Sequence, residues 1–271
     1  DIPGKGSASV KGQMAFATKA SDPKTGGDIY RDPSLVADID VSSQNIPKTL
    51  QAVASVEGVA FPSSWKTGAF QGRVKAAGDR FEIQDARLRV ADTSAQLSGS
   101  LAQGERGGRG KLSVDAAVDK LNLDTLQDDK SAAAGGGDFA GTLKALSFPY
   151  DLSFDVGIQE LHTQGQKING LRAQGELLAD SLTFSNLSAQ DYAGAALKLS
   201  GGIGSLKALS GIDIKVAAQS SDLPRFAQAL KIDPAALPAN LSRASGNVTA
   251  KGSAEKLAVS AAIQALNGEV I

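Results

Sequence analysis

Most of this chain alternates apolar and polar residues with a period of two. Successive side chains of an extended strand point to opposite sides, so this pattern gives each strand one apolar and one wet side. The clearest segments are 112–116, 152–158, 212–216 and 257–261. The long helical patterns that connect the strands of a parallel sheet are missing. The alternation predicts a mainly β fold: an elongated, curved antiparallel sheet, or half-pipe, with a few short helices.

One longer phrase occurs twice. SQNIPKTLQAV at 43–53 corresponds to SSDLPRFAQAL at 220–230, and further downstream GRVKAAG at 72–78 corresponds to GNVTAKG at 246–252. Asn45 and Asp222 are expected N-caps, each followed two residues later by a proline in the first turn of a short helix, where a missing N–H costs nothing. A chain that repeats a strand–helix–strand order in this way is typical of a repeat architecture.

We therefore expect one elongated repeat domain over 1–271. It would consist of repeat A at about 34–101, a middle unit at about 110–203 and a truncated repeat B at about 210–271. The chain begins at Asp1 rather than Met, and it stops at Ile271 within an alternating pattern. We expect it to be a fragment of a longer protein.

Glycine recurs at the centre of a short apolar–x–Gly–x–apolar pattern. The eight glycines are Gly12, Gly72, Gly99, Gly141, Gly175, Gly201, Gly246 and Gly268. With a period of two, each points to the same side as its apolar neighbours. Glycine weakens a strand, so its presence needs a reason such as a bend, a bulge or a close approach. Two interpretations stay open: the glycines allow the sheet to curve, or they leave room on the apolar side for a guest molecule.

The same alternation identifies the residues that would line an apolar groove. These candidates are Phe81, Ile83, Leu112, Val114, Leu152, Phe154, Val156, Ile158, Ile212, Ile214, Val216, Leu257 and Val259. A closed sandwich core would show the same pattern. Aromatic residues make up only 5% of the chain, fewer than we expect of such a core, and this favours an open groove.

Composition excludes several classes of function. The formal net charge of −1 gives no basic field to hold nucleic acid or an anionic membrane surface. The absence of cysteine excludes disulfides, thiolate nucleophiles and cysteine-based zinc sites. His162 is the one histidine and cannot by itself form a multi-histidine metal site or a Ser-His-Asp triad. We expect no catalytic residue, no metal and no cofactor. No run of 18 or more apolar residues occurs, so nothing in the sequence predicts a transmembrane helix.

Several segments resemble the AsmA-like family of bacterial envelope proteins, which is related to TamB and to the bridge-like lipid transfer proteins. They are FEIQDARLRVADTSAQLSGSL (81–101), LNLDTL (121–126), FPYDLSFDVGIQEL (148–161) and LTFSNLSAQDYAGAALKLSGGI (182–203). The resemblance implies a periplasmic β half-pipe tethered to the inner membrane through a segment absent from this chain. It also implies transport of phospholipid or another acyl lipid in outer-membrane biogenesis, and no catalytic residues.

Three functions remain as hypotheses. The first is a non-catalytic segment that binds and transfers lipid, with other envelope proteins as additional partners. The second is a β-repeat scaffold for envelope protein assembly without lipid cargo, which would use a closed core and exposed edge strands. The third is a hydrolase of envelope polymers, which would need a clustered pair of carboxylates in a cleft.

Overall fold

The structure is a computed structural model that describes residues 6–16, 18–21, 28–31, 33–46, 67–104, 108–124, 150–237 and 241–265. Its strands are β1 (Ser7–Ala15), β2 (Thr18–Ser21), β3 (Asp28–Arg31), β4 (Ser34–Ser43), β5 (Gly68–Ala77), β6 (Arg80–Val90), β7 (Thr93–Ala102), β8 (Gly110–Asn122), β9 (Tyr150–Thr163), β10 (Gln166–Leu178), β11 (Ser181–Tyr192), β12 (Ala195–Ser205), β13 (Ser210–Ser220), β14 (Ala244–Ser253) and β15 (Leu257–Ala265). The helices described are α3 (Leu223–Ala229) and a 3₁₀ turn, η3 (Pro234–Ala236). The prediction of a mainly β chain is confirmed.

Thirteen strands form one open sheet. Their order is β1-β4-β5-β6-β7-β8-β9-β10-β11-β12-β13-β14-β15, so β1 and β15 are its edge strands, while β2 and β3 pair separately. The chain divides into two compact units, 1–116 and 117–271, and the boundary lies within β8. The boundary also lies inside the middle unit expected from the repeats.

Unit 1 keeps one side of its sheet apolar by inserting a β-bulge. In β6, Ile83 pairs with Gly99 but Ala86 pairs with Leu97, so one additional residue lies between them. Asp85, within this bulge, has φ 49°. A single additional residue shifts the alternation by one. Phe81 and Ile83 before the bulge therefore face the same side as Ala86, Leu88 and Val90 after it.

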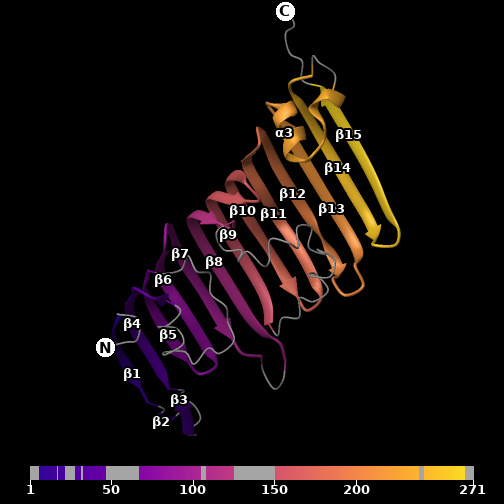
Figure 1. Ribbon diagram of the computed structural model, residues 1–271. Coiled ribbons are helices and arrows are strands. Elements are labelled where there is room, and N and C mark those ends of the chain that lie inside the picture. The colour runs from indigo at the N-terminus through magenta and orange to yellow at the C-terminus, as the bar shows by residue number, and fades with distance from the viewer. Residues whose placement is uncertain are drawn as a thin grey trace, which may run out of the picture. The chain divides into compact units, whose positions relative to one another are not determined.

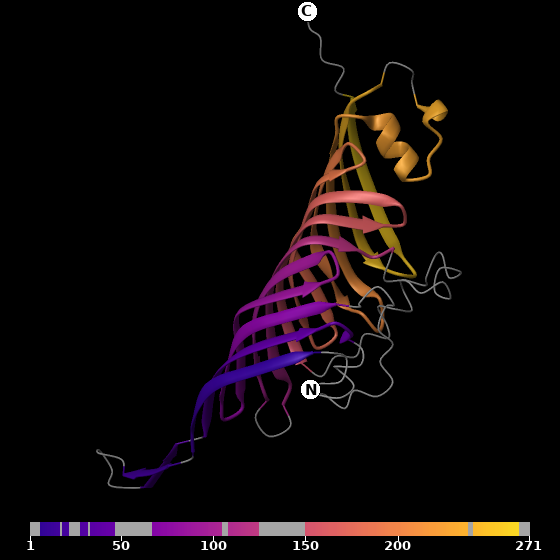
Figure 2. The same ribbon diagram turned by 60° about the vertical axis from the view of Figure 1, so that its left-hand side comes forward.

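Unit 2 contains the antiparallel strands β9 to β15 (Figure 1). Its β11 also carries a bulge: Phe184 pairs with Gly175, whereas Leu187 pairs with Ala173, which leaves Ser185 as the additional residue. Here the apolar side chains change from even to odd residue numbers, the reverse of β6, and again stay on one face of the sheet. Figure 2 shows these strands curved, with α3 on one side of them.

Apart from Ala189 and Ala227 of α3, the buried residues of unit 2 lie at or near the two ends of its strands. At one end Leu177, Leu206 and Leu209 form a small cluster, against which Leu152, Leu182 and Ile203 pack. At the other end, near α3, Ala195, Ser220 and Ala244 are buried. The middle of the sheet, between these ends, has no such cluster among the described residues.

The helix predicted after Asp222 is confirmed. The Asp222 carboxylate accepts the backbone N–H of Arg225 at 3.1 Å, and Pro224 lies in the first turn. Leu230 is the C-cap of this helix and is 49% exposed. Of the first expected helix, Asn45 and Ile46 are described and the remainder lies outside the described residues.

The two repeated phrases begin with equivalent serines. Ser43 ends β4 and Ser220 ends β13, and both are buried. Each hydroxyl accepts the backbone N–H of the second residue that follows, at 2.9 Å in Asn45 and at 3.2 Å in Asp222. Relative to these serines, the strands that follow pair in different registers, because Gly72 pairs with Ile39 whereas Gly246 pairs with Ala218.

Candidate functional site

Three rows of apolar residues cross the middle of unit 2, each formed by residues paired from strand to strand. The first row is Phe154, Gly175, Phe184, Gly201, Ile214, Ala250 and Val259. The second row is Val156, Ala173, Leu187, Leu199, Val216, Val248 and Ala261. The third row is Ile158, Leu171, Ala189, Leu197, Ala218, Gly246 and Ile263, in which Leu171 and Ala189 are placed by alternation. None of these side chains is polar. Together they are called the apolar face of unit 2.

This apolar face is open to solvent. Ala189 is buried, and every other residue of the three rows is half-buried or exposed. Exposure rises toward the edge strand, with Val248 37% exposed, Val259 60% and Ile263 76%. A second layer packed over the rows would bury these side chains, as in a β-sandwich. The closed-core alternative therefore does not fit unit 2 as far as the structure describes it.

Unit 1 has an apolar face built in the same way. Its residues are Ala8, Val10, Gly12, Met14, Leu35, Ala37, Ile39, Val41, Phe70, Gly72, Val74, Ala76, Phe81, Ile83, Ala86, Leu88, Ala95, Leu97, Gly99 and Leu101. Ala37, Val74, Ala86 and Ala95 are buried. At the edge strand β1, Val10 is 66% exposed and Met14 is 60% exposed.

Eleven of the thirteen groove candidates lie on the side of the sheet that carries these apolar faces. Phe81 and Ile83 lie in unit 1, whereas Leu152, Phe154, Val156, Ile158, Ile212, Ile214, Val216, Leu257 and Val259 lie in unit 2. Leu112 and Val114 are half-buried in β8. Of this set, Leu152 packs against the leucine cluster at the strand ends. None of the candidates is buried, and Phe81, Leu257 and Val259 are exposed.

Six of the eight predicted glycines lie on the apolar faces: Gly12, Gly72, Gly99, Gly175, Gly201 and Gly246. Gly141 and Gly268 lie outside the described residues.

Most of these glycines sit against a neighbouring strand. A Cβ added at Gly99 would lie 2.6 Å from the Ser113 carbonyl oxygen, and one at Gly12 would lie 2.8 Å from the Ala37 Cβ. Gly201 has φ 115°, a conformation that favours glycine. Gly246 has more room, since its nearest neighbour would be the Ala262 carbonyl oxygen at 3.3 Å. This geometry supports the curvature interpretation of the glycines and leaves little space for a guest at the glycines themselves.

In β10, β11 and β12, sequence reasoning identified Gly175 and Gly201 but not the other residues that complete the rows. The bulge at Ser185 interrupts the alternation of β11, so that Leu187 follows Phe184 at a spacing of three. In β10 the row positions carry Ala173 and Gly175, which are too small to mark an apolar side. The alternation of apolar residues changes at Ser185, and this change in the sequence was the signal that could have predicted the bulge.

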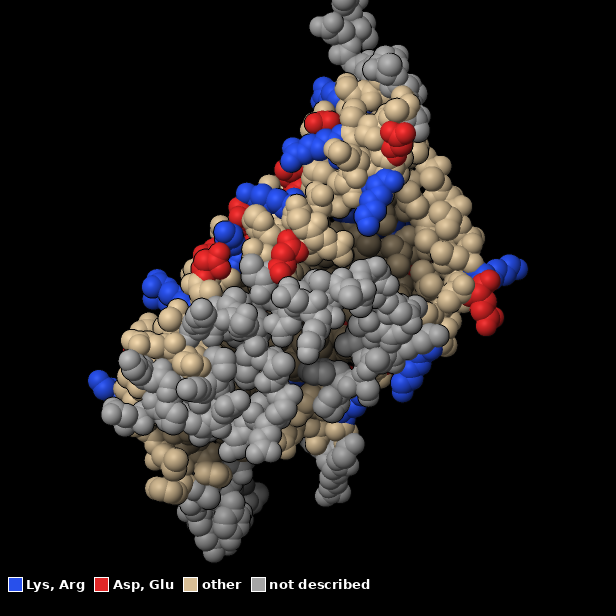
Figure 3. All heavy atoms as spheres, viewed as in Figure 1, with Lys and Arg blue, Asp and Glu red and all other residues tan. Residues whose placement is uncertain are grey.

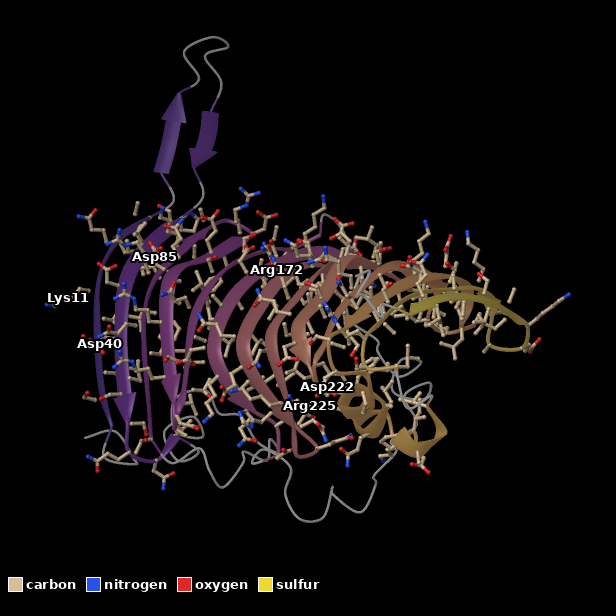
Figure 4. All side chains as sticks on the ribbon, turned by 90° about the horizontal axis from the view of Figure 1, so that it is seen from above. Lys11, Asp40, Asp85, Arg172, Asp222 and Arg225 are labelled. Atoms are coloured by element: carbon tan, nitrogen blue, oxygen red, sulfur yellow. The ribbon has the colours of Figure 1, made fainter. Side chains whose placement is uncertain are left out.

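The opposite side, the polar face, is held by ion pairs between neighbouring strands. The Arg73 guanidinium donates two hydrogen bonds to Asp38, at 2.8 and 3.2 Å, and lowers the pKa of that carboxyl. Arg172 does the same to Asp155, and the Gln174 amide adds a 2.7 Å hydrogen bond that lowers the Asp155 pKa further. Figure 4 shows Arg172 over the strands, while Asp222 and Arg225 lie beside α3.

Glu160 is the centre of a charged cluster on unit 2. It pairs with Lys167 and with His162, whose Nε2 lies 2.6 Å from Glu160 Oε1, and Lys120 Nζ lies 4.0 Å away. The hydrogen bond from Lys167, followed by that from His162, lowers the pKa of Glu160 to about 2. His162 therefore lies within β9 as a partner of Glu160. The cluster is half-exposed and ties β9 to β10.

The three rows contain no charged side chain, and the Glu160 cluster follows Ile158 on the same side of β9. In Figure 3 the surface of unit 2 beside β14 and β15 is uncharged, and blue and red spheres gather along the margins. Among the residues described, no group of three or more His, Cys, Asp and Glu is arranged to hold a metal ion. Nor does any described helix have the length and apolarity to cross a membrane.

Comparisons with known proteins add no relative. The chain matches no protein-family model, no curated protein and no solved structure.

Proposed function

We propose that this protein binds the acyl chains of phospholipids on its apolar faces and transfers them without catalysing a reaction. The observation that carries the proposal is the set of three rows in unit 2, which contain no polar side chain and are open to solvent. Soluble proteins rarely expose a contiguous apolar surface of this kind unless it meets a ligand, a membrane or another protein.

The energetics favour an acyl chain as the guest. Moving an acyl chain of about 16 carbons from an apolar environment into water costs ~13 kcal/mol, at ~0.8 kcal/mol for each methylene. A carrier has to offset part of this cost wherever the acyl chain lies on it. Its apolar surface must therefore be continuous from strand to strand. The rows cross the strands β9 to β15 without a polar side chain. At ~4.8 Å between strands, they extend about 29 Å.

The resemblance to the AsmA-like family supports the setting of this proposal. It implies a periplasmic segment of a protein tethered to the inner membrane, with a role in outer-membrane biogenesis. The location, the tether and the lipid class remain predictions.

Photo-crosslinking at two neighbouring residues of β13 tests the proposal. Val216 belongs to the second row, and the adjacent Lys215 points to the polar face. Replacing each in turn by p-benzoylphenylalanine and irradiating with radiolabelled phosphatidylethanolamine compares the two faces at one depth of the sheet. We expect a crosslinked lipid adduct from position 216 and little from 215. Equal labelling at both positions, or none, would reject binding on the apolar face.

A scaffold remains the second candidate, because the edge strand β15 carries no charged residue and is exposed from Leu257 to Gln264. Such an edge can pair with a strand of another protein. The scaffold hypothesis also requires a closed core, which the exposure of the three rows does not support. Recovery of a stoichiometric envelope protein with no lipid by native mass spectrometry would favour the scaffold.

A further inference from the structure

We propose that the end of α3, formed by Leu230, Lys231 and Ile232 and called the α3 tip, docks on the surface of an anionic phospholipid membrane. This inference rests on the proposed function, because it names the surface from which the apolar face of unit 2 would receive lipid.

The α3 tip leaves two aliphatic side chains in water. The helix ends in a Schellman motif, in which Ile232 N–H donates to the Ala227 carbonyl and Lys231 N–H donates to the Gln228 carbonyl, both at 2.9 Å. In this motif the residue at the Ile232 position usually packs back on the helix. Here Ile232 and Leu230 are each 49% exposed. The tip therefore presents an apolar contact that the helix itself does not use.

The residue between them is a lysine in an unfavourable conformation. Lys231 has φ 61°, where glycine is the usual residue of a Schellman motif. Its ammonium is exposed between two aliphatic side chains. This combination suits the membrane interface, because a lysine can keep its charge at the phosphate level while its stem and the aliphatic neighbours enter the acyl region.

Charge complementarity favours an anionic surface. Arg225, Lys231 and Arg243 are exposed, and in the part of the chain described their side chains make no hydrogen bond or ion pair. The two acids of the same segment are used locally: Asp222 accepts the Arg225 N–H and Asp233 accepts the Ala235 N–H. Unpaired lysine and arginine side chains beside exposed aliphatics are the groups that anionic headgroups attract.

The α3 tip lies at the end of the strands that is nearest to the third row. Phe226 of α3 packs edge to face on Tyr192, with ring centroids 6.2 Å apart, and the Tyr192 hydroxyl lies 3.5 Å from the Ala229 carbonyl. Tyr192 ends β11 and pairs with Ala195, the first residue of β12. A membrane that contacts the tip is therefore next to the third row, beside Ala189 and Leu197.

A single fluorophore tests the docking, since the chain has no native cysteine. Leu230→Cys labelled with the environment-sensitive fluorophore NBD is mixed with vesicles of phosphatidylcholine alone or of phosphatidylcholine with phosphatidylglycerol. Lys256→Cys, in the turn between β14 and β15 at the other end of the strands, carries the same label as a control. We expect a blue shift and brighter emission at position 230 with phosphatidylglycerol, weakened by salt, and no change at position 256. An unchanged spectrum at position 230, or equal changes at both positions, would overturn the proposal.

Sedimentation with the same vesicles gives the second measurement. We expect Leu230→Ser with Ile232→Ser to lower the partition onto phosphatidylglycerol vesicles by about fivefold or more. Leu178→Ser is the matched control, because Leu178 is also 49% exposed and lies outside the three rows. Equal partition of the double variant and the wild type would contradict the proposal.

Fatty-acid binding without vesicles separates the two proposals. The double variant should bind a soluble fluorescent fatty acid as the wild type does, because the three rows are unchanged. If the wild type binds no fatty acid but the label at position 230 still responds to vesicles, the proposed function fails and the docking surface stands. If fatty acid binds and the label does not respond, the reverse holds.

Discussion

Phe154 and Phe184 meet edge to face across a strand that lies between them, with ring centroids 6.0 Å apart and an interplanar angle of 74°. The residue between them in the first row is Gly175 of β10, which pairs with both. A Cβ added at Gly175 would lie 2.9 Å from Phe154 Cζ. The absence of a side chain at Gly175 therefore allows the two rings to meet above the sheet.

Replacing Gly175 by alanine should destabilise the protein. The new methyl group would press on the Thr183 carbonyl oxygen and the Phe154 ring, which is a local overpacking that costs about 1–3 kcal/mol. Gly246→Ala is the control, because its added Cβ has no neighbour closer than 3.3 Å. Urea unfolding of the two variants gives the comparison. A smaller loss in Gly175→Ala than in Gly246→Ala would show that the close approach at Gly175 is wrongly placed.

Phe154→Asp separates the lipid carrier from the scaffold. In an open face the half-buried position can hold a solvated carboxylate, so we expect cooperative unfolding to persist. We also expect fatty-acid affinity to fall about tenfold or more, because a charge interrupts the first row. Ser153→Asp, next to it on the polar face, should leave binding unchanged. Circular dichroism and a fluorescent fatty acid measure the two effects. An unfolded Phe154→Asp chain would instead indicate a closed core.

Glu160 should contribute a pH-dependent part of the stability. Its pKa is about 2 in the folded chain, below the ordinary value of 4.5. The unfolded state therefore binds the proton more tightly, and the contribution is complete above pH 4.5 and is lost as the pH falls toward 2. We expect Glu160→Gln to be less stable than the wild type at pH 7 and the difference to vanish near pH 2. Unfolding curves across this range check the sign, and a difference that grows in acid would contradict it.

Lys231→Gly should stabilise the helix end while weakening vesicle binding. Glycine adopts φ 61° without the steric cost that lysine carries, and this favours the folded state by about 0.5–1 kcal/mol. The same change removes one of the cations of the α3 tip. Thermal unfolding and vesicle sedimentation measure the two effects. A destabilised variant would show that Lys231 has a structural role.

The alternating segments predict strands β8, β9, β13 and β15 and their apolar sides, because a period of two is a local property of the chain. The helix after Asp222 could also be predicted, because its N-cap and the proline in its first turn are local signals. The residues that pair with Gly72 and with Gly246 in the neighbouring strands could not be predicted from the sequence. The register depends on the neighbouring strand as well as on the repeated phrase.

Several hairpin turns could not be predicted from the sequence either. They use Gln164–Gly165, Ala179–Asp180 and Ala193–Gly194, with positive φ at Gln164, Ala179 and Ala193. These lack the Asn-Gly or Asp-Gly pairs that mark two-residue turns in a sequence. Openness of the apolar face could not be read from the alternation, since a covered and an uncovered face require the same side chains. The exposure of Val248, Val259 and Ile263 distinguishes the two.

The bulges at Asp85 and Ser185 determine which changes in strand length keep the apolar side chains on one face of the sheet. Removing Asp85 would restore strict alternation in β6 with Phe81, Ile83, Leu88 and Val90 still on one side. Removing Arg87 instead would turn Leu88 and Val90 to the other side and put Arg89 in the vacated place. Away from the bulges, changes in strand length therefore keep the apolar side chains on one face only when they add or remove two residues, and at each bulge one additional residue is already accommodated.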